Sequence, residues 1–199
     1  MLMYKKKVVE EKPRLEISYD EMVESPRDWS NLGYFITCDG NYSSPDNVFE
    51  GELRDWIKET GQEVASQDEH IKVIKDWFKL NTDEKVLEIY PITKYEHSGV
   101  SYSLGDKFGF DYSNNGFYII TDKTQKEVGT DKKDFEKVIG SELEIYNKYC
   151  NGEIYRFYLH DKDGEEEDSC CGFYEVEDIR ECLPKEFKDE DLMDYFVYN

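Results

Sequence analysis

The pattern of apolar and polar residues predicts a chain of short strands interrupted by helices. Runs rich in β-branched and aromatic residues, bounded by Gly, Pro, Asn or Asp, are typical of strands. Six segments fit this description: residues 14–18, 34–38, 85–92, 99–104, 116–121 and 153–160. We expect the last of them to pair with a strand near 168–174, with Asp163-Gly164 at the hairpin turn.

Apolar residues at helical spacing predict the other elements. The strongest pattern covers residues 131–150, where Asn151-Gly152 then supplies a stop signal. Ser66-Gln67-Asp68-Glu69 is a capping box, in which a hydroxyl and a carboxylate satisfy the first backbone amides of a second helix. Further helices are expected near residues 47–60, 175–183 and 186–196. Pro91 cannot donate to a strand ladder, so we expect it at a strand's end or a sheet edge.

This order of elements predicts an α+β fold, a single domain with a mainly antiparallel sheet packed against a few helices. The chain has 199 residues, which is an ordinary size for one domain. Residues 1–13 are expected to form a basic N-terminal segment, either poorly ordered or at an edge, and residues 14–183 the domain itself. Residues 184–199 are expected to form an acidic C-terminal helix, packed on the domain or appended to it.

Five cysteines and the absence of an export signal predict a reducing compartment. The N-terminus has no apolar stretch behind its lysines, and no run of about 18 apolar residues would span a membrane. An odd number of cysteines in this context favours free thiols over disulfides. Cys170 and Cys171 are adjacent, so on a strand they would point to opposite faces. A redox or nucleophilic role is the alternative, but no basic neighbour in sequence would lower a thiol pKa.

Negative charge is the most unusual global property of the sequence. Asp and Glu number 46 against 25 Lys and Arg, for a net charge of -21. Because duplex DNA carries one charge per ~1.7 Å, this excess equals that on about 35 Å of duplex. The protein could therefore present a phosphate-like charge density to a basic nucleic-acid-binding groove. The plainer alternative is that the acidity serves solubility alone.

The C-terminal 39 residues hold fifteen of the acids and only four bases. Two clusters within them are the predicted partner-binding residues: Asp161, Asp163, Glu165, Glu166, Glu167 and Asp168, followed by Glu186, Asp189, Glu190, Asp191 and Asp194. Three apolar residues lie among the second cluster at helical spacing: Leu192, Tyr195 and Phe196. Core packing explains that spacing, although tyrosines are also frequent interface anchors.

Motifs for catalysis, metals and cofactors are weak or absent. The segment from Asp161 to Glu165 suggests an EF-hand, but its Gly falls at position four and Gly172 occupies position twelve, so only a weak surface cation site remains open. His97 follows an apolar strand and could act with Glu96, Ser98 or Cys38. No known catalytic or phosphate-binding signature accompanies it. The sequence thus predicts no catalytic residue, no metal and no cofactor.

Five segments carry a resemblance to a known family: Glu24-Ser-Pro-Arg-Asp-Trp-Ser-Asn-Leu-Gly33, Tyr90-Pro-Ile-Thr-Lys-Tyr-Glu-His-Ser-Gly99, Asn115-Gly-Phe-Tyr-Ile-Ile-Thr121, Tyr146-Asn-Lys-Tyr-Cys-Asn-Gly152 and Asp168-Ser-Cys-Cys-Gly-Phe-Tyr174. In this order they resemble the segments of a largely uncharacterised family of small phage and mobile-element proteins. The chain departs from that pattern at Phe110-Asp111-Tyr112 and at Cys171. The resemblance implies a phage origin and action in the cytoplasm of a host bacterium, and it implies no chemistry.

Three functional hypotheses follow from these observations. The first is a phage-encoded acidic protein that inhibits a host nucleic-acid-binding defence enzyme, of the anti-CRISPR or anti-restriction type, by nucleic-acid charge mimicry. Its partner would be the basic groove of a nuclease or effector, with no direct contact to nucleic acid or membrane. The second is a small phage enzyme that uses His97 with a nearby carboxylate or thiol. The third is a regulatory or scaffolding protein whose acidity is incidental.

Overall fold

The computed structural model describes residues 13–37, 44–46 and 66–198. Contacts between Cα atoms group the chain into two compact units. Unit 1 comprises residues 1–23 and 152–199, and unit 2 comprises residues 24–151. The expected basic segment 1–13 lies almost wholly outside the described residues, as do Cys38 and the helix expected near 47–60.

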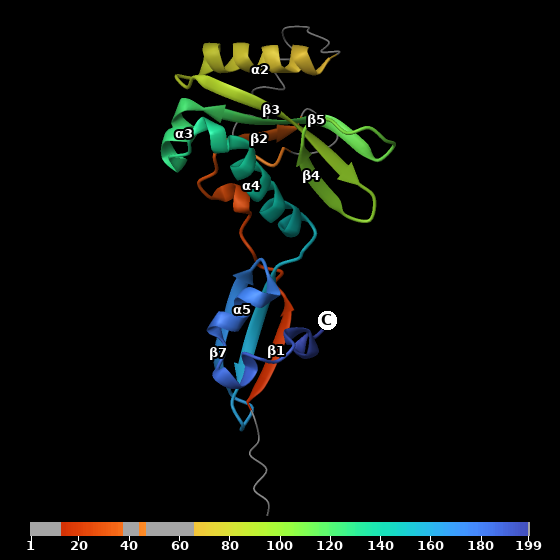
Figure 1. Ribbon diagram of the computed structural model, residues 1–199, viewed down its shortest axis with the longest axis vertical. Coiled ribbons are helices and arrows are strands. Elements are labelled where there is room, and N and C mark those ends of the chain that lie inside the picture. The colour runs from red at the N-terminus through yellow and green to blue at the C-terminus, as the bar shows by residue number, and fades with distance from the viewer. Residues whose placement is uncertain (1–12, 38–43, 47–65, 199) are drawn as a thin grey trace, which may run out of the picture. The chain divides into compact units, whose positions relative to one another are not determined.

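Unit 2 is built on a four-stranded antiparallel sheet with the order β2-β5-β3-β4 (Figure 1). Its strands are β2 (Tyr34–Thr37), β3 (Val86–Glu96), β4 (Val100–Leu104) and β5 (Tyr112–Thr121). Strands β3 and β5 alternate apolar side chains to both faces, so both faces bury a core. One core packs against the helix α2 (Gln67–Asn81) and the other against α4 (Phe135–Cys150), which lie on opposite faces of the sheet.

The capping box predicted before α2 is confirmed. The Ser66 hydroxyl accepts the Glu69 amide, and the Glu69 carboxylate accepts the Ser66 amide at 3.0 Å. A second capping box, from Thr121 and Thr124, starts the short helix α3 (Asp122–Val128), which the sequence analysis did not predict. Its apolar content is too low to produce a helical pattern. Two 3-10 turns, η1 (Pro26–Asp28) and η2 (Lys132–Asp134), complete unit 2.

Pro91 lies in the middle of β3 rather than at its end, but the expected sheet edge is confirmed, because among the described strands β4 pairs only with Ile92 to Glu96 and the side of β3 facing β4 is outside that ladder at Pro91. The Pro91 carbonyl accepts the Gly105 amide at 2.9 Å. The nitrogen and the carbonyl of one strand residue point to the same side, so the Pro91 nitrogen also faces β4, where that strand's pairing ends at Leu104. The ladder between β3 and β5 therefore loses no donor.

Unit 1 contains a three-stranded antiparallel sheet with the order β1-β6-β7. The strands are β1 (Arg14–Tyr19), β6 (Tyr155–His160) and β7 (Glu166–Phe173). One face of this sheet is covered by α5 (Val176–Cys182) and by the 3-10 turns η3 (Lys185–Phe187) and η4 (Leu192–Tyr195). The predicted hairpin of β6 and β7 is confirmed. Both units have antiparallel sheets packed against helices, so the α+β fold class is also confirmed.

The prediction of a helix over residues 186–196 is wrong, because this segment forms two 3-10 turns instead. Leu183, Phe187 and Leu192 are buried in the core of unit 1, and their spacing of four and five does not follow one helical face. Acids three and four residues apart, such as Glu186 and Glu190, would also repel each other along a helix. The segment is nevertheless packed on unit 1 rather than detached from it.

Candidate functional site

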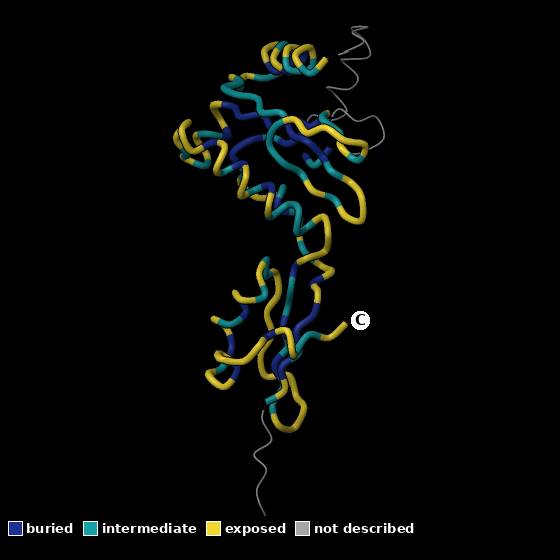
Figure 2. Tube along the Cα trace, turned by 45° about the vertical axis from the view of Figure 1, so that its right-hand side comes forward, coloured by how far each residue is buried: buried dark blue, intermediate teal, exposed yellow. Residues whose placement is uncertain are grey.

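Exposed carboxylates dominate the C-terminal part of unit 1. Of the fifteen acids after His160, all but Asp161 are exposed, and Figure 2 shows exposed residues along the hairpin loop and most of β7. We call the fourteen exposed acids from Asp163 to Asp194 the acidic surface. Four bases in the same segment cannot neutralise them: Lys162, Arg180, Lys185 and Lys188. Ten of the eleven predicted partner-binding acids belong to this surface.

Asp161 is the exception, because its carboxylate shapes the hairpin loop. Asp161 Oδ1 accepts the amides of Asp163 at 2.8 Å and of Glu165 at 3.0 Å. Gly164 adopts the left-handed conformation with φ of 86°, which a glycine accommodates without strain. The loop thus holds the side chains of Asp163 and Glu165 outward on a defined backbone.

The second acidic cluster lies on turns that Arg180 holds in place. The Arg180 guanidinium donates to the carbonyls of Lys188 at 2.6 Å and of Glu190 at 2.9 Å. It also pairs with Glu177 at 2.8 Å, which lowers the pKa of that carboxyl through the hydrogen bond. Arg180 is therefore used by the fold, and the acids of this segment keep their excess of charge.

Only one face of the unit 1 sheet is packed against the α5 layer. Leu15, Ile17, Phe157 and Leu159 point toward the α5 layer. Alternation places the side chains between them on the other face. This other face carries charges of both signs. Arg14 is next to Glu16, Arg156 donates to the Ser18 hydroxyl at 3.3 Å, and Glu166 is the ladder partner of His160. The acids of α5 and of the turns after it therefore belong to the layer on one face, away from these arginines.

In unit 2 a buried charge network around Arg27 links η1 and the loop after it to the sheet and to α4. The Arg27 side chain is only 3% exposed and makes a two-pronged contact with Asp46, at 2.9 and 2.7 Å. It also donates to the Gly33 carbonyl at 2.7 Å and contacts Glu142 at 3.3 Å. The Tyr118 hydroxyl accepts the Gly33 amide at 3.0 Å and donates to Glu142.

Burial alone would lower the pKa of the Arg27 guanidinium, but the hydrogen bond and charge of Asp46 outweigh it, and the pKa is raised. Burial and the Glu142 carboxylate raise the pKa of the Tyr118 hydroxyl. Arg27 therefore stays charged and Tyr118 stays protonated. The charged and polar groups of the network are bound to one another, and together they hold the loop after η1 against the sheet and α4.

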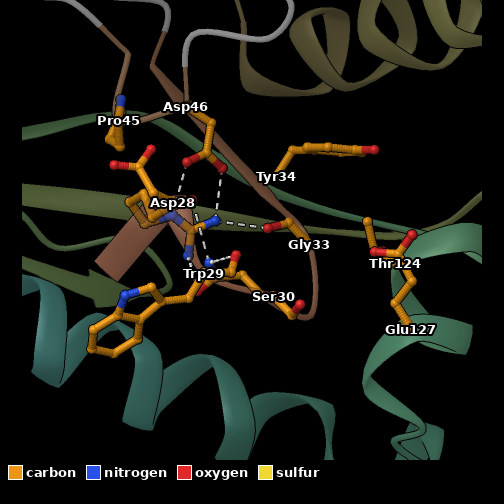
Figure 3. Close-up of a pocket in the computed structure, with 11 residues that line it drawn as sticks. Asp28, Trp29, Ser30, Gly33, Tyr34, Pro45, Asp46, Thr124 and Glu127 are labelled. Carbon is orange, nitrogen blue, oxygen red and sulfur yellow. Dashed lines mark hydrogen bonds and ion pairs between the residues drawn. The ribbon is translucent and has the colours of Figure 1, made fainter. Parts of the chain in front are cut away.

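A pocket of about 390 Å³ lies beside this network. Its lining includes Asp28, Trp29, Tyr34, Thr124 and Glu127, which surround it in Figure 3. The Tyr34 hydroxyl donates to Glu84 outside the pocket at 3.0 Å, and burial raises its pKa. Arg27 and Asp46 also line the pocket but are committed to each other. No pair of groups in this lining forms a catalytic constellation.

His97 lies in the tight turn between β3 and β4. Its side chain is 69% exposed, and its Nδ1 atom is 3.6 Å from Asp111. The backbones of His97 and Gly99 are hydrogen-bonded to each other across the turn. General acid–base catalysis needs a concave site that orders a substrate and excludes water, and an exposed turn does not supply one. Its position gives the His97 enzyme hypothesis no support.

The other predicted chemical groups are also placed without forming a site. Cys150, Cys170, Cys171 and Cys182 are free thiols. Within the described ranges no three His, Cys, Asp or Glu side chains gather in a way that could hold a metal ion. No helix of the described residues is long and apolar enough to cross a bilayer.

Sequence reasoning missed two exposed aromatic features. Phe108 is 89% exposed and Phe110 fully exposed, in the loop between β4 and β5. The Asn114 side chain fixes this loop, because it accepts the Lys107 amide and donates to the Lys107 carbonyl at 2.9 Å. The second feature is a group of aromatic rings at the C-terminus of unit 1. The only sign of this group in the sequence was that residues 191–199 contain tyrosines among acidic residues.

Comparisons with protein-family models, curated proteins and solved structures give no significant match. In three of the segments quoted for the family resemblance, polar side chains anchor backbone groups. Besides Arg27 and Tyr118, Asn147 bonds both polar groups of the Tyr102 backbone, at 2.7 and 3.0 Å. Asn151 does the same for Val100, at 2.9 and 2.7 Å. These contacts stabilise the backbone of unit 2.

Proposed function

We propose that this chain is a non-enzymatic binding protein that occupies the basic nucleic-acid-binding groove of a host defence enzyme, of the anti-CRISPR or anti-restriction type. The acidic surface would take the place of the nucleic acid backbone. One observation carries the proposal, namely that fourteen of the fifteen acids after His160 are exposed while only four bases accompany them.

Physical chemistry supports this use of the acidic surface. A groove that binds phosphates releases counterions when its lysines and arginines are neutralised, and exposed carboxylates can neutralise them in the same way. Complementary charge also speeds the encounter between partners. The resemblance to phage proteins supplies a setting in which an inhibitor of host nucleases has a use.

The test is displacement of a labelled DNA duplex from purified restriction enzymes and CRISPR effector nucleases. We expect the protein to displace the duplex from at least one of them, and the triple variant Asp163→Asn, Glu165→Gln, Glu167→Gln to lose at least tenfold in potency. A matched control in unit 2, Asp131→Asn, Glu136→Gln, Glu144→Gln, changes the net charge equally and should stay within about twofold of the parent. Equal losses in the two variants would mean that only total charge matters, and failure to displace DNA from any enzyme would reject the proposal.

The exposed loop of Phe108 and Phe110 favours a second candidate function, a regulatory or scaffolding protein that binds a partner through apolar contacts. Two exposed aromatic side chains on a hydrogen-bonded loop are typical of an interface anchor, because the loop loses little entropy on binding. Such binding would persist at 1 M salt and would be lost in the Phe108→Ser, Phe110→Ser variant. A partner complex that shows both properties, and that tolerates neutralisation of the acidic surface, would favour this function over charge mimicry.

A further inference from the structure

The C-terminus of unit 1 carries a connected group of aromatic rings. The ring of Phe196 lies 4.9 Å from that of Tyr19 and 4.9 Å from that of Tyr198, centroid to centroid. Tyr19 also stacks on Tyr155 at 5.5 Å. We call these four residues the aromatic patch. They come from β1, β6 and the chain's end, which are distant in sequence.

Backbone pairing holds the aromatic patch together. The Val197 amide donates to the Ile17 carbonyl at 2.7 Å, and Phe196 forms a parallel bridge with Ile17. The end of the chain thereby lies along the free edge of β1, where it places its aromatic rings beside Tyr19. The patch is therefore a built surface, with rings contributed by elements that the core of unit 1 fixes.

The aromatic patch is only partly used by the core. Tyr198 is 77% exposed and Tyr19 is 43% exposed, and Met193 and Val197 beside them are also exposed. Phe196 and Tyr155 lie deeper and pack against the core cluster. The two outer residues, Tyr19 and Tyr198, therefore keep exposed surface that a partner can reach.

Carboxylates border the aromatic patch in the chain. Glu21 follows Tyr19, and Asp191 and Asp194 precede Phe196 within a few residues, all three of them exposed. The Tyr195 hydroxyl donates to the Glu190 carboxylate at 3.3 Å, and burial together with Glu190 raises the pKa of that tyrosine. An aromatic ring near negative charges attracts cations. A guanidinium suits such a site better than an ammonium, because it is planar and can also stack on the ring.

We infer that the aromatic patch is an arginine-selective docking surface, on which arginine side chains of a basic protein segment stack while the bordering carboxylates pair with them. This inference rests on the proposed function and names the residue type that the acidic surface meets. A single-stranded nucleic acid could also stack on the rings, but the net charge of -21 opposes it. A second copy of this chain would bring an equally negative surface.

Two peptides of equal charge test the inference without the enzyme partner, namely nona-arginine and nona-lysine. Their affinities for the full chain are measured by fluorescence anisotropy at physiological salt. We expect the parent to prefer nona-arginine by about fivefold or more. The Tyr19→Ala, Tyr198→Ala variant should lose this preference while its affinity for nona-lysine stays within about twofold. Tyr19→Phe with Tyr198→Phe should retain it, because the rings remain.

Two controls separate this site from general acidity and from aromatic content. Phe108→Ala with Phe110→Ala removes two exposed rings of unit 2 and should keep the preference. Asp189→Asn with Asp194→Asn should weaken both peptides alike. Equal binding of the two peptides by the parent, or a preference that survives loss of both tyrosine rings, would overturn the inference. A dimer in sedimentation that the tyrosine variant abolishes would also overturn it, in favour of self-association.

The outcome is distinct from that of the proposed function. A preference for arginine that depends on the tyrosines supports the docking surface even if no nuclease in the displacement assay is inhibited. Conversely, displacement of DNA by the Tyr19→Ala, Tyr198→Ala variant at parental potency, together with equal peptide affinities, would leave the proposed function standing and reject the docking surface.

Discussion

The buried acids around Arg27 in unit 2 and the acidic surface of unit 1 are used in opposite ways. In unit 2, Asp46 and Glu142 are tied to Arg27, and Glu84 accepts the hydroxyl of Thr121 at 2.7 Å. In unit 1, the acids after His160 are almost all exposed and outnumber the bases fifteen to four. The carboxylates of the unit 2 network, and Glu84, are thus part of the fold, whereas those of the acidic surface leave their charge available to a partner. The total of -21 hides this difference.

The largest expected change in stability follows from replacing Arg27, the cation of the unit 2 network. Arg27→Met would leave Asp46 and Glu142 buried without their counter-charge, and breaking a buried pair in this way costs about 3–5 kcal/mol of folding free energy. Chemical denaturation with hydrogen exchange should locate the loss in unit 2. Lys137→Met on the exposed side of α4 is the matched control, with a change below about 0.5 kcal/mol. Similar losses in the two variants would contradict the structural role of the network.

Alkaline pH provides the next test, since the pKa of Tyr118 is raised by burial and by Glu142. An unfolded tyrosine loses its proton near pH 10, while the folded chain keeps the proton on Tyr118 to a higher pH. This contribution to stability is complete below pH 10 and declines as pH rises above it, by about 1.4 kcal/mol per pH unit. Urea unfolding from pH 9 to 11 should show this slope, and Tyr118→Phe should have a shallower one. Parallel slopes in the two proteins would show that Tyr118 is not held protonated.

Asp20 is an acid of unit 1 that stabilises the fold, so it can be compared with the exposed acids of the same unit. Its carboxylate accepts the amides of Gly172 at 3.1 Å and Met22 at 3.2 Å, and Gly172 has a left-handed φ of 81°. Asp20→Ala should cost unit 1 about 1–3 kcal/mol, because the Gly172 and Met22 amides lose their hydrogen bonds to a charged, buried acceptor. Glu21→Ala, one residue away and exposed, should have almost no effect on thermal unfolding. An equally small effect of Asp20→Ala would place it with the surface acids.

The smallest expected change in stability is that of the acidic surface itself. Asp163→Asn, Glu165→Gln, Glu167→Gln should alter the free energy of unfolding by no more than about 0.5 kcal/mol, with slight stabilisation at low salt as repulsion falls. Thermal unfolding at two salt concentrations measures this. A clear destabilisation would mean that these acids hold the hairpin loop, as Asp161 does, and are not reserved for binding.

Local sequence patterns predicted most of the helices and strands. They predicted few of the contacts between residues that are distant in sequence. The capping box at Ser66 and the hairpin of β6 and β7 involve neighbours in sequence, so their signals are readable. The helix expected at 186–196 failed because the acids and the core spacing compete with helical periodicity there. Arg27 and Glu142 are 115 residues apart, and the spacing of apolar residues along the chain does not predict a contact over such a distance. The acid clusters were found by counting, whereas the aromatic patch depends on strand pairing that the sequence does not reveal.

Salt dependence of binding tests the central claim most directly. The measurement uses a nuclease from which the protein displaces DNA, and it gives the affinity of the protein for that nuclease from about 50 to 500 mM salt. Three proteins are compared: the parent, the variant neutralised at Asp163, Glu165 and Glu167, and the control neutralised at Asp131, Glu136 and Glu144. We predict a steep fall of affinity with salt for the parent and the control and a clearly shallower fall for the unit 1 variant. Tight binding that is indifferent to salt, or a slope that the two variants change equally, would contradict the account.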